Sequence, residues 1–191
     1  MAVEPVVSAD GRSVVELESF APDDAAAARA AGAELLWVHT NDDLSPHGLR
    51  QAGAYVRMHA DEVPVRASRT VPLLEERDYP EVLARAYRGL WGHKHVSPLA
   101  EPPADAVIVG IPVVGICRVW PADRLIDGPG VLPEGRSPDA YASLLLSACA
   151  VLGEGPADLD SWGDDEEVLE AYEDLGFDVV ERVQGWELAL A

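Results

Sequence analysis

Basic residues are scarce in this chain of 191 residues. It has 14 lysines and arginines against 34 aspartates and glutamates, so its formal net charge at pH 7 is −20. A surface this acidic repels phosphate backbones and anionic lipid headgroups, which argues against nucleic-acid and membrane-surface roles. The same charge would attract a cationic small molecule such as an amine, although an acidic surface can also serve solubility alone.

Cysteines and long apolar runs are also scarce. The two cysteines, Cys117 and Cys149, each lie within an apolar run, and their spacing does not resemble that of metal ligands. We expect two buried free thiols in a reducing compartment and no metal. No window approaches the length of a membrane-spanning helix, and no basic region followed by a long apolar stretch opens the chain. These features predict a cytoplasmic location.

Apolar residues make up 48% of the chain, enough for one full core with a small additional lobe. Hydrophobic periodicity predicts strands over 13–17, 35–39, 54–59, 70–74, 106–109, 113–119 and 126–131. Helices are expected from Pro22 to about Gly32, from Ser45 to Gly53, from Asp78 to Arg88, and from Ser137 onward. We therefore predict an N-terminal αβ lobe over residues 1–62 and a second domain over 68–191. The stretch from Asn41 to the third strand resembles the stretch that begins at Gly163, so the lobe could be a partial repeat, although any αβαβ stretch would align as well.

The C-terminal region combines a strand from Asp158, a helix carrying Tyr172, a Leu175-Gly176-Phe177 corner and a closing strand. This order resembles the end of a GCN5-related N-acetyltransferase (GNAT). The resemblance implies an α+β fold with a mixed, mostly antiparallel sheet flanked by helices. It also implies that Tyr172 reprotonates the thiolate of coenzyme A. The periodicity alone is equally compatible with a core tyrosine.

The segment Leu125–Arg136 resembles the fourth strand of that family running into a Val-x-Pro-x-x-Arg pattern. In the family this strand separates from its neighbour and pairs with the pantetheine arm of acetyl-CoA or another acyl-CoA. The resemblance implies an oxyanion site at the strand amides and a set of cofactor-binding residues, namely Gly130, Val131, Leu132, Arg136, Ser137 and Ala140. Asp127 falls where several members have a glutamate that takes a proton from the substrate ammonium. Asp-Gly is also a common turn signal, and the residues alone do not decide between the two readings.

The loop that follows departs from the family pattern. The family has a basic residue and two glycines there, so that backbone amides at a helix N-terminus approach the pyrophosphate. Here Asp139 and Tyr141 stand at the glycine positions, and Pro138 removes one amide donor. Asp139 also brings a negative charge toward two phosphates. The helix itself should form, because Ser137 can cap it.

An aromatic and histidine-containing stretch extends from Tyr87 to His95. It falls where the family lines the acceptor cleft, which implies substrate contacts for Trp91 and Tyr87. His93 and His95 are further candidates for the proton acceptor. Metal binding is not expected, because no third ligand is close in sequence.

These features predict an N-acyltransferase that moves an acetyl or other acyl group from a CoA thioester to the amine of a small molecule. The alternative is a GNAT-fold protein that has lost normal acetyl-CoA use and performs other chemistry or ligand binding in the same cleft. A homodimer is compatible with the sequence.

Overall fold

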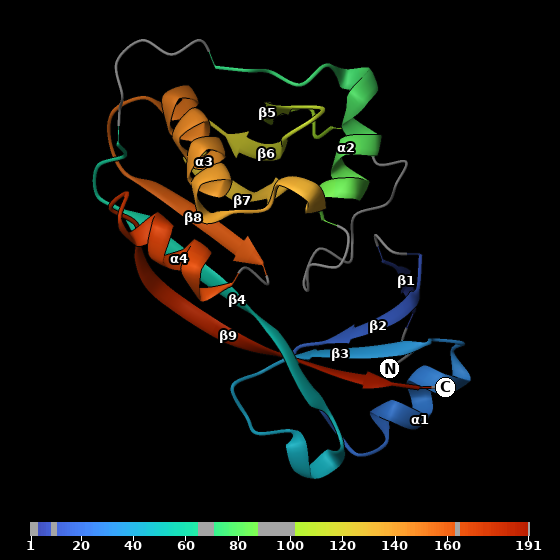
Figure 1. Cartoon of the computed structure of the whole chain (residues 1–191). Helices are drawn as coiled ribbons and strands as arrows, with labels where there is room; N and C mark the ends of the chain where they lie inside the picture. Colours follow the sequence, from blue (N-terminus) through green and yellow to red (C-terminus); the bar gives the residue numbers. More distant parts are fainter. Residues whose placement is uncertain (1–3, 9–10, 65–70, 88–101, 163–164, 191) are drawn as a thin grey trace.

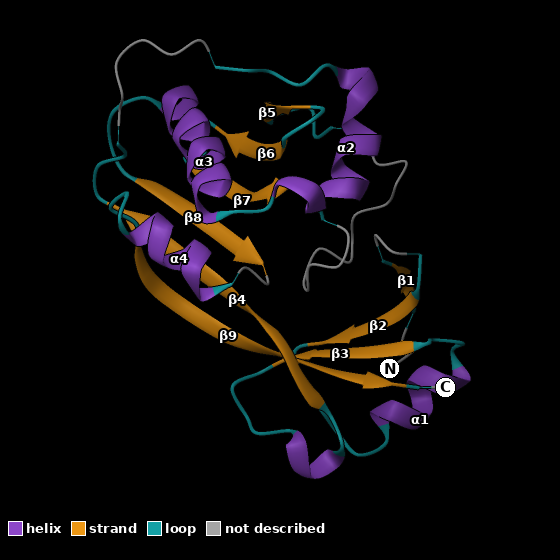
Figure 2. Ribbon diagram, viewed as in Figure 1, coloured by secondary structure: helices purple, strands orange, loops and turns teal. Residues whose placement is uncertain are grey.

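The computed structural model describes residues 4–8, 11–64, 71–87, 102–162 and 165–190. Its strands form one nine-stranded sheet in the order β1-β2-β3-β9-β4-β8-β7-β6-β5. In the described part, all neighbouring strands pair antiparallel except β2 with β3 and β7 with β8. The expected mixed, mostly antiparallel sheet flanked by helices is therefore confirmed (Figure 2).

The strands are β1 (Val6–Val7), β2 (Ser13–Leu17), β3 (Leu35–His39), β4 (Arg50–Ala60), β5 (Val107–Ile111), β6 (Gly115–Trp120), β7 (Leu125–Val131), β8 (Ala157–Trp162) and β9 (Asp178–Ala189). The α-helices are α1 (Asp24–Ala30), α2 (Tyr79–Ala86), α3 (Pro138–Leu152) and α4 (Glu166–Glu173). The predicted strands at 13–17, 35–39 and 126–131 and the helix after Ser137 are confirmed within one or two residues.

Strands β4 and β9 are the longest, and they run through both parts of the molecule (Figure 1). The C-terminal half of β9 pairs with β3, from Leu35 opposite Ala189 to His39 opposite Gly185. On its other side β9 pairs with β4 over nearly its whole length, from Arg50 opposite Glu187 to His59 opposite Asp178. The last strand thus completes the sheet of the first part, so the parts predicted at 1–62 and 68–191 share one sheet.

The helix expected from Ser45 to Gly53 is wrong. A single 3-10 turn covers Ser45–His47 and ends at Gly48, whose φ is +81°. Strand β4 then begins at Arg50, because Arg50 pairs with Glu187 of the long β9. Pairing with a distant strand overrides the local helix signals of Ser45 and Pro46. The strand expected over 70–74 is reduced, among its described residues, to an isolated bridge between Leu73 and Val109.

The two faces of the larger part of the sheet are covered differently. Side chains on alternate positions of β6 point to opposite faces. Cys117 and Val119 join the core beneath α3 and α4, while Ile116 packs with α2. Both cysteines are buried and free, as expected. No described helix is long and apolar enough to cross a membrane.

Helix α3 is fixed at both ends by side chains. Ser137 accepts a hydrogen bond from the Ala140 amide at 3.3 Å, which confirms its role as the N-cap. At the other end, Arg124 donates to the carbonyls of Leu152 and Gly153, both at 3.2 Å. These bonds satisfy carbonyl groups that have no partner within the helix. The helix is therefore held firmly against β5, β6 and β7.

Candidate functional site

Strands β7 and β8 separate partway along their length. Their parallel pairing runs from Leu125 opposite Asp158 to Asp127 opposite Asp160. Beyond that point the register of β7 with β6 shifts, so that Gly128 and Pro129 together oppose one residue of β6. A bulge of this kind bends a strand, and Pro129 has no amide to donate to a neighbour. The bulge and the proline together explain why β7 leaves β8 after Asp127.

Asp127 lies at the point where the two strands part. Its carboxylate pairs with the Arg118 guanidinium of β6, and both side chains are mostly buried, with 16% and 17% of their surface exposed. Burial raises the pKa of Asp127, nearby Arg118 lowers it, and the charge of Asp160 raises it, with a net upward shift. A carboxylate with a raised pKa accepts a proton more readily near neutral pH than an ordinary one. The turn interpretation of Asp127-Gly128 is wrong, because both residues lie within β7.

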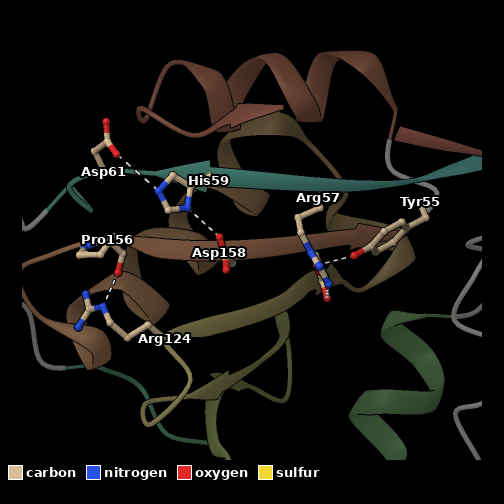
Figure 3. Close-up of polar contacts among 8 residues, drawn as sticks. Tyr55, Arg57, His59, Asp61, Arg124, Pro156 and Asp158 are labelled. Carbon is tan, nitrogen blue, oxygen red and sulfur yellow. Dashed lines mark hydrogen bonds and ion pairs between the residues drawn. The ribbon is translucent and has the colours of Figure 1, made fainter. Parts of the chain in front are cut away.

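A row of paired side chains continues from Asp160 onto β4. Tyr55 donates to the Asp160 carboxylate at 2.8 Å, and Arg57 donates to it at 3.0 Å. One step along the same two strands, His59 Nδ1 lies 2.7 Å from an Asp158 carboxylate oxygen (Figure 3). We call these residues, together with Trp162, the polar ladder. Each member on β4 lies opposite a member on β8, so the ladder follows directly from the register.

Tyr87, a predicted substrate contact, lies just after α2 and is completely buried. Its hydroxyl donates to the Gly128 carbonyl at 2.9 Å. A Cβ atom on Gly130 would lie 2.2 Å from the Tyr87 ring, so the ring needs glycine at that position. In this conformation Tyr87 and Gly130 pack against each other where β7 leaves the sheet.

Arg136, a predicted phosphate contact, binds the protein's own backbone. Its guanidinium donates to the Val131 carbonyl at 3.2 Å and to the Ala86 carbonyl at 3.0 Å, which connects β7 to the end of α2. Leu132 is buried, and its amide donates to Val114. Next to Arg136 the N-termini of α3 and α4 enclose a small cavity of about 170 Å³, whose acidic lining residues are Asp165 and Glu167.

Tyr172 lies on α4 and is completely buried in the large core cluster with Val168, Leu169 and Phe177. The predicted Leu-Gly-Phe corner is present: Gly176 has a φ of +91°, and the Phe177 amide donates to the Tyr172 carbonyl. The catalytic role of Tyr172 stays a prediction. Trp91, His93 and His95 lie outside the described residues.

Sequence reasoning missed the polar ladder and a second histidine pair. His39 Nε2 lies 2.6 Å from the Glu16 carboxylate, between the neighbouring strands β3 and β2. The polar ladder could have been predicted from the sequence. Polar residues alternate at 55, 57 and 59 and again at 158, 160 and 162, with charges of opposite sign. Pairing those two stretches antiparallel would have predicted it.

No family model matches the sequence, and no curated protein matches it. Solved structures match at low identity. A proposed acetyltransferase from Pyrococcus horikoshii is 13% identical with a TM-score of 0.60, and the match covers 86% of this chain and 59% of that protein. A proposed GNAT-family acetyltransferase from Novosphingobium aromaticivorans is 22% identical with a TM-score of 0.55, covering 91% and 83%. A GCN5-related N-acetyltransferase from Kribbella flavida is 17% identical with a TM-score of 0.52, covering 97% and 89%.

This chain therefore spans less than two thirds of the Pyrococcus protein, but most of the other two. The shared feature is the arrangement of strands and helices rather than the sequence. The mixed nine-stranded sheet with its flanking helices is the α+β fold of the GCN5-related N-acetyltransferases.

Proposed function

We propose that the protein is an N-acyltransferase that moves an acetyl or similar acyl group from a CoA thioester to the amine of a small molecule. The observation that supports this most strongly is the separation of β7 from β8 directly after Asp127 and Asp160. It creates a strand edge next to a carboxylate of raised pKa. The acyl thioester supplies the activated carbonyl group, and the protein supplies the position and the proton acceptor.

The protein offers a suitable surface for the pantetheine arm of a CoA thioester and a poor one for its pyrophosphate. The separated edge of β7 is suited to an extended pantetheine arm, because strand pairing with β8 has ended there. The N-terminus of α3 fits a pyrophosphate poorly. Asp139 lies in its first turn, Asp165 and Glu167 line the adjacent cavity, and Arg136 already binds backbone carbonyls. We therefore assign no role in the reaction to the nucleotide part of the donor.

In this proposal Asp127 takes the proton that an ammonium group must lose before it can attack a carbonyl. Arg118 positions that carboxylate, since the two side chains form a buried ion pair. The pKa of Asp127 lies above the ordinary value of 3.8, which brings it closer to the pH at which the reaction would run.

The test is an acyl-transfer assay with acetyl-CoA and a panel of small amines, combined with calorimetric titration of acetyl-CoA. Asp127→Asn preserves the shape of the side chain and should lower kcat/KM by about 100-fold or more. Asp158→Asn is the matched control, because it changes a carboxylate of β8 that pairs with His59 instead, and should leave kcat/KM within about twofold. Equal activity of the parent and Asp127→Asn would remove Asp127 from the proposal. Absence of both transfer and thioester binding would overturn the function.

The acidic N-terminus of α3 favours a second candidate, a GNAT-fold protein that binds a different ligand in the same cleft. Asp139→Gly separates the two. If CoA thioesters bind, removing this carboxylate should tighten their binding by about tenfold, with a smaller gain at high salt. If neither the parent nor Asp139→Gly binds acetyl-CoA at low salt, the second candidate is favoured.

A further inference from the structure

A cavity of about 700 Å³ lies where β2 and β3 meet β4, β8 and β9. Its size is within the range of small-molecule sites in proteins. The polar and aromatic residues that line it come from both parts of the chain: Glu16, Glu18, His39, Tyr55, Trp162 and Glu181. We call it the interlobe cavity.

One wall of the interlobe cavity is aromatic. Tyr55 and Trp162 lie opposite each other on β4 and β8, with ring centroids 4.4 Å apart and ring planes inclined at 46°. The His39 ring meets Trp162 edge-on at 6.0 Å. The faces of tyrosine and tryptophan rings attract organic cations.

The other polar residues of the lining are mostly acidic. Glu16 already pairs with His39 at 2.6 Å. Glu18 and Glu181 are exposed, and no salt bridge joins either of them to another described residue. Glu181 lies opposite Arg57 across β9 and β4, close enough for their charges to interact. No lysine or arginine is among the residues that line the cavity, and the neighbouring Arg57, which lies over the Tyr55 ring at 5.8 Å, is already paired with Asp160. An anionic ligand is therefore disfavoured here, and a cation is favoured.

The lining suits an organic cation better than a metal ion. Among the described residues, no group of three or more histidine, cysteine, aspartate or glutamate side chains could hold a metal. The carboxylates are spread along a cavity that also offers ring faces, which suits an extended molecule with separated charges.

We propose that the interlobe cavity binds an aliphatic diamine, with one ammonium group near Glu18 and Glu181 and the alkyl chain against Tyr55 and Trp162. Trp162 lies two residues along β8 from Asp160, where β7 and β8 part. Asp127 does not line the cavity, so in this proposal the second nitrogen extends along β8 toward Asp160, the register neighbour of Asp127. This inference deepens the proposed function and rests on it for the role of the diamine as acyl acceptor. The binding itself does not depend on acyl transfer.

The test is calorimetric titration of the full chain, without any thioester, with 1,4-diaminobutane, 1-aminobutane and 1,4-butanediol. The diamine should bind at least about tenfold more tightly than the monoamine, since only the diamine offers a second ammonium group to the acidic lining of the cavity and to Asp160 beyond it. The diol should show no binding. Added salt should weaken diamine binding, because the carboxylates are exposed.

Two variants test the two walls separately. The double variant Glu18→Gln/Glu181→Gln should weaken diamine binding by about tenfold, and Trp162→Leu should weaken it by a similar factor. Glu170→Gln is the matched control, because Glu170 is exposed on α4 and does not line the cavity, and it should change nothing. Thermal unfolding of each variant checks that it is folded.

Equal affinity for the diamine and the monoamine would overturn the inference, as would unchanged binding in both folded variants. Diamine binding without any acyl transfer would support the cavity and contradict the proposed function. Acyl transfer to monoamines as fast as to diamines, insensitive to the glutamate variants, would contradict the cavity assignment and leave the proposed function standing.

Discussion

Two arginine–aspartate pairs lie on the same face of the sheet: the covered pair, Arg118–Asp127, and the open pair, Arg57–Asp160. Their carboxylates are about equally buried, and the pairs differ in the exposure of the arginine. Arg118 and Asp127 have 17% and 16% of their side-chain surface exposed and lie near Tyr87. Arg57 has 43% exposed and Asp160 has 14%. Asp127 and Asp160 are direct neighbours across β7 and β8.

The difference shows that two similarly buried carboxylates can have different partners: one faces a buried arginine, and the other accepts hydrogen bonds from a half-exposed arginine and a tyrosine. In the covered pair, burial raises the pKa of Asp127, the proton acceptor of the proposed function. In the open pair, Asp160 accepts hydrogen bonds from Tyr55 and Arg57 and so holds the aromatic wall of the interlobe cavity in place. Burial of Tyr55 and its hydrogen bond to Asp160 raise the pKa of the Tyr55 hydroxyl, which keeps it protonated as a donor.

The largest expected effect comes from breaking the covered pair. Arg118→Met should lower the free energy of unfolding by about 3–5 kcal/mol, because Asp127 is left as a buried charge without its partner. The pKa of Asp127 is raised in the folded state. As pH rises, the folded protein therefore keeps the proton on Asp127 at pH values where the unfolded chain has already lost it. The stabilisation from that proton is fully present below the ordinary pKa of 3.8 and is lost as pH rises through the folded value. The decrease in the free energy of unfolding caused by Arg118→Met should therefore be smaller at pH 4 than at pH 7, as measured by urea unfolding.

The double variant Arg118→Met/Asp127→Leu is the control for that prediction. It replaces the pair by apolar side chains and should restore most of the lost stability. If Arg118→Met alone has the same free energy of unfolding as the parent, the covered pair does not contribute more stability than the open pair.

A smaller effect is expected at the open pair. Asp160→Asn should cost about 1–3 kcal/mol, because Tyr55 and Arg57 lose their charged acceptor. Arg57→Met should cost about 1 kcal/mol or less, since nearly half of its side chain is in water. Urea unfolding of both variants measures the difference. A cost for Arg57→Met equal to that of Arg118→Met would remove burial as the explanation.

The smallest effect concerns His59, at the far end of the polar ladder. Its hydrogen bond to Asp158, more than the charges of Asp158 and Asp61, raises its pKa above the ordinary 6.5. The stabilisation from its protonated form is present below 6.5 and is lost as pH rises through the folded value. NMR titration of the imidazole should show the raised pKa, and Asp158→Asn should move it back toward 6.5. An unchanged pKa in that variant would contradict the assigned cause.

The sequence predicted the elements whose periodicity is local and strong. The long helix after Ser137 and the buried strand at 35–39 form as expected, because capping and apolar spacing act within a few residues. The start of β4 at Arg50 depends on pairing with Glu187, which no local signal contains. The residues of the candidate site show the same division between local signals and distant partners. Asp127 could be identified as a candidate from the residues of its own segment. The hydrogen-bond partners of Arg136 and the proposed role of Glu181 depend on segments far apart in the chain.

The placement of β9 between β3 and β4 has a consequence for the order of folding. Leu35 is hydrogen-bonded in register with Ala189, so the sheet of the first part closes only when a strand from the far end of the chain arrives. Contacts this distant in sequence slow folding and prolong the exposure of unpaired strand edges. During synthesis β3 and β4 would have to wait, with open edges, until β9 leaves the ribosome. A chaperone that covers these edges would therefore affect the yield of this protein more than that of one whose first part is complete without its last strand.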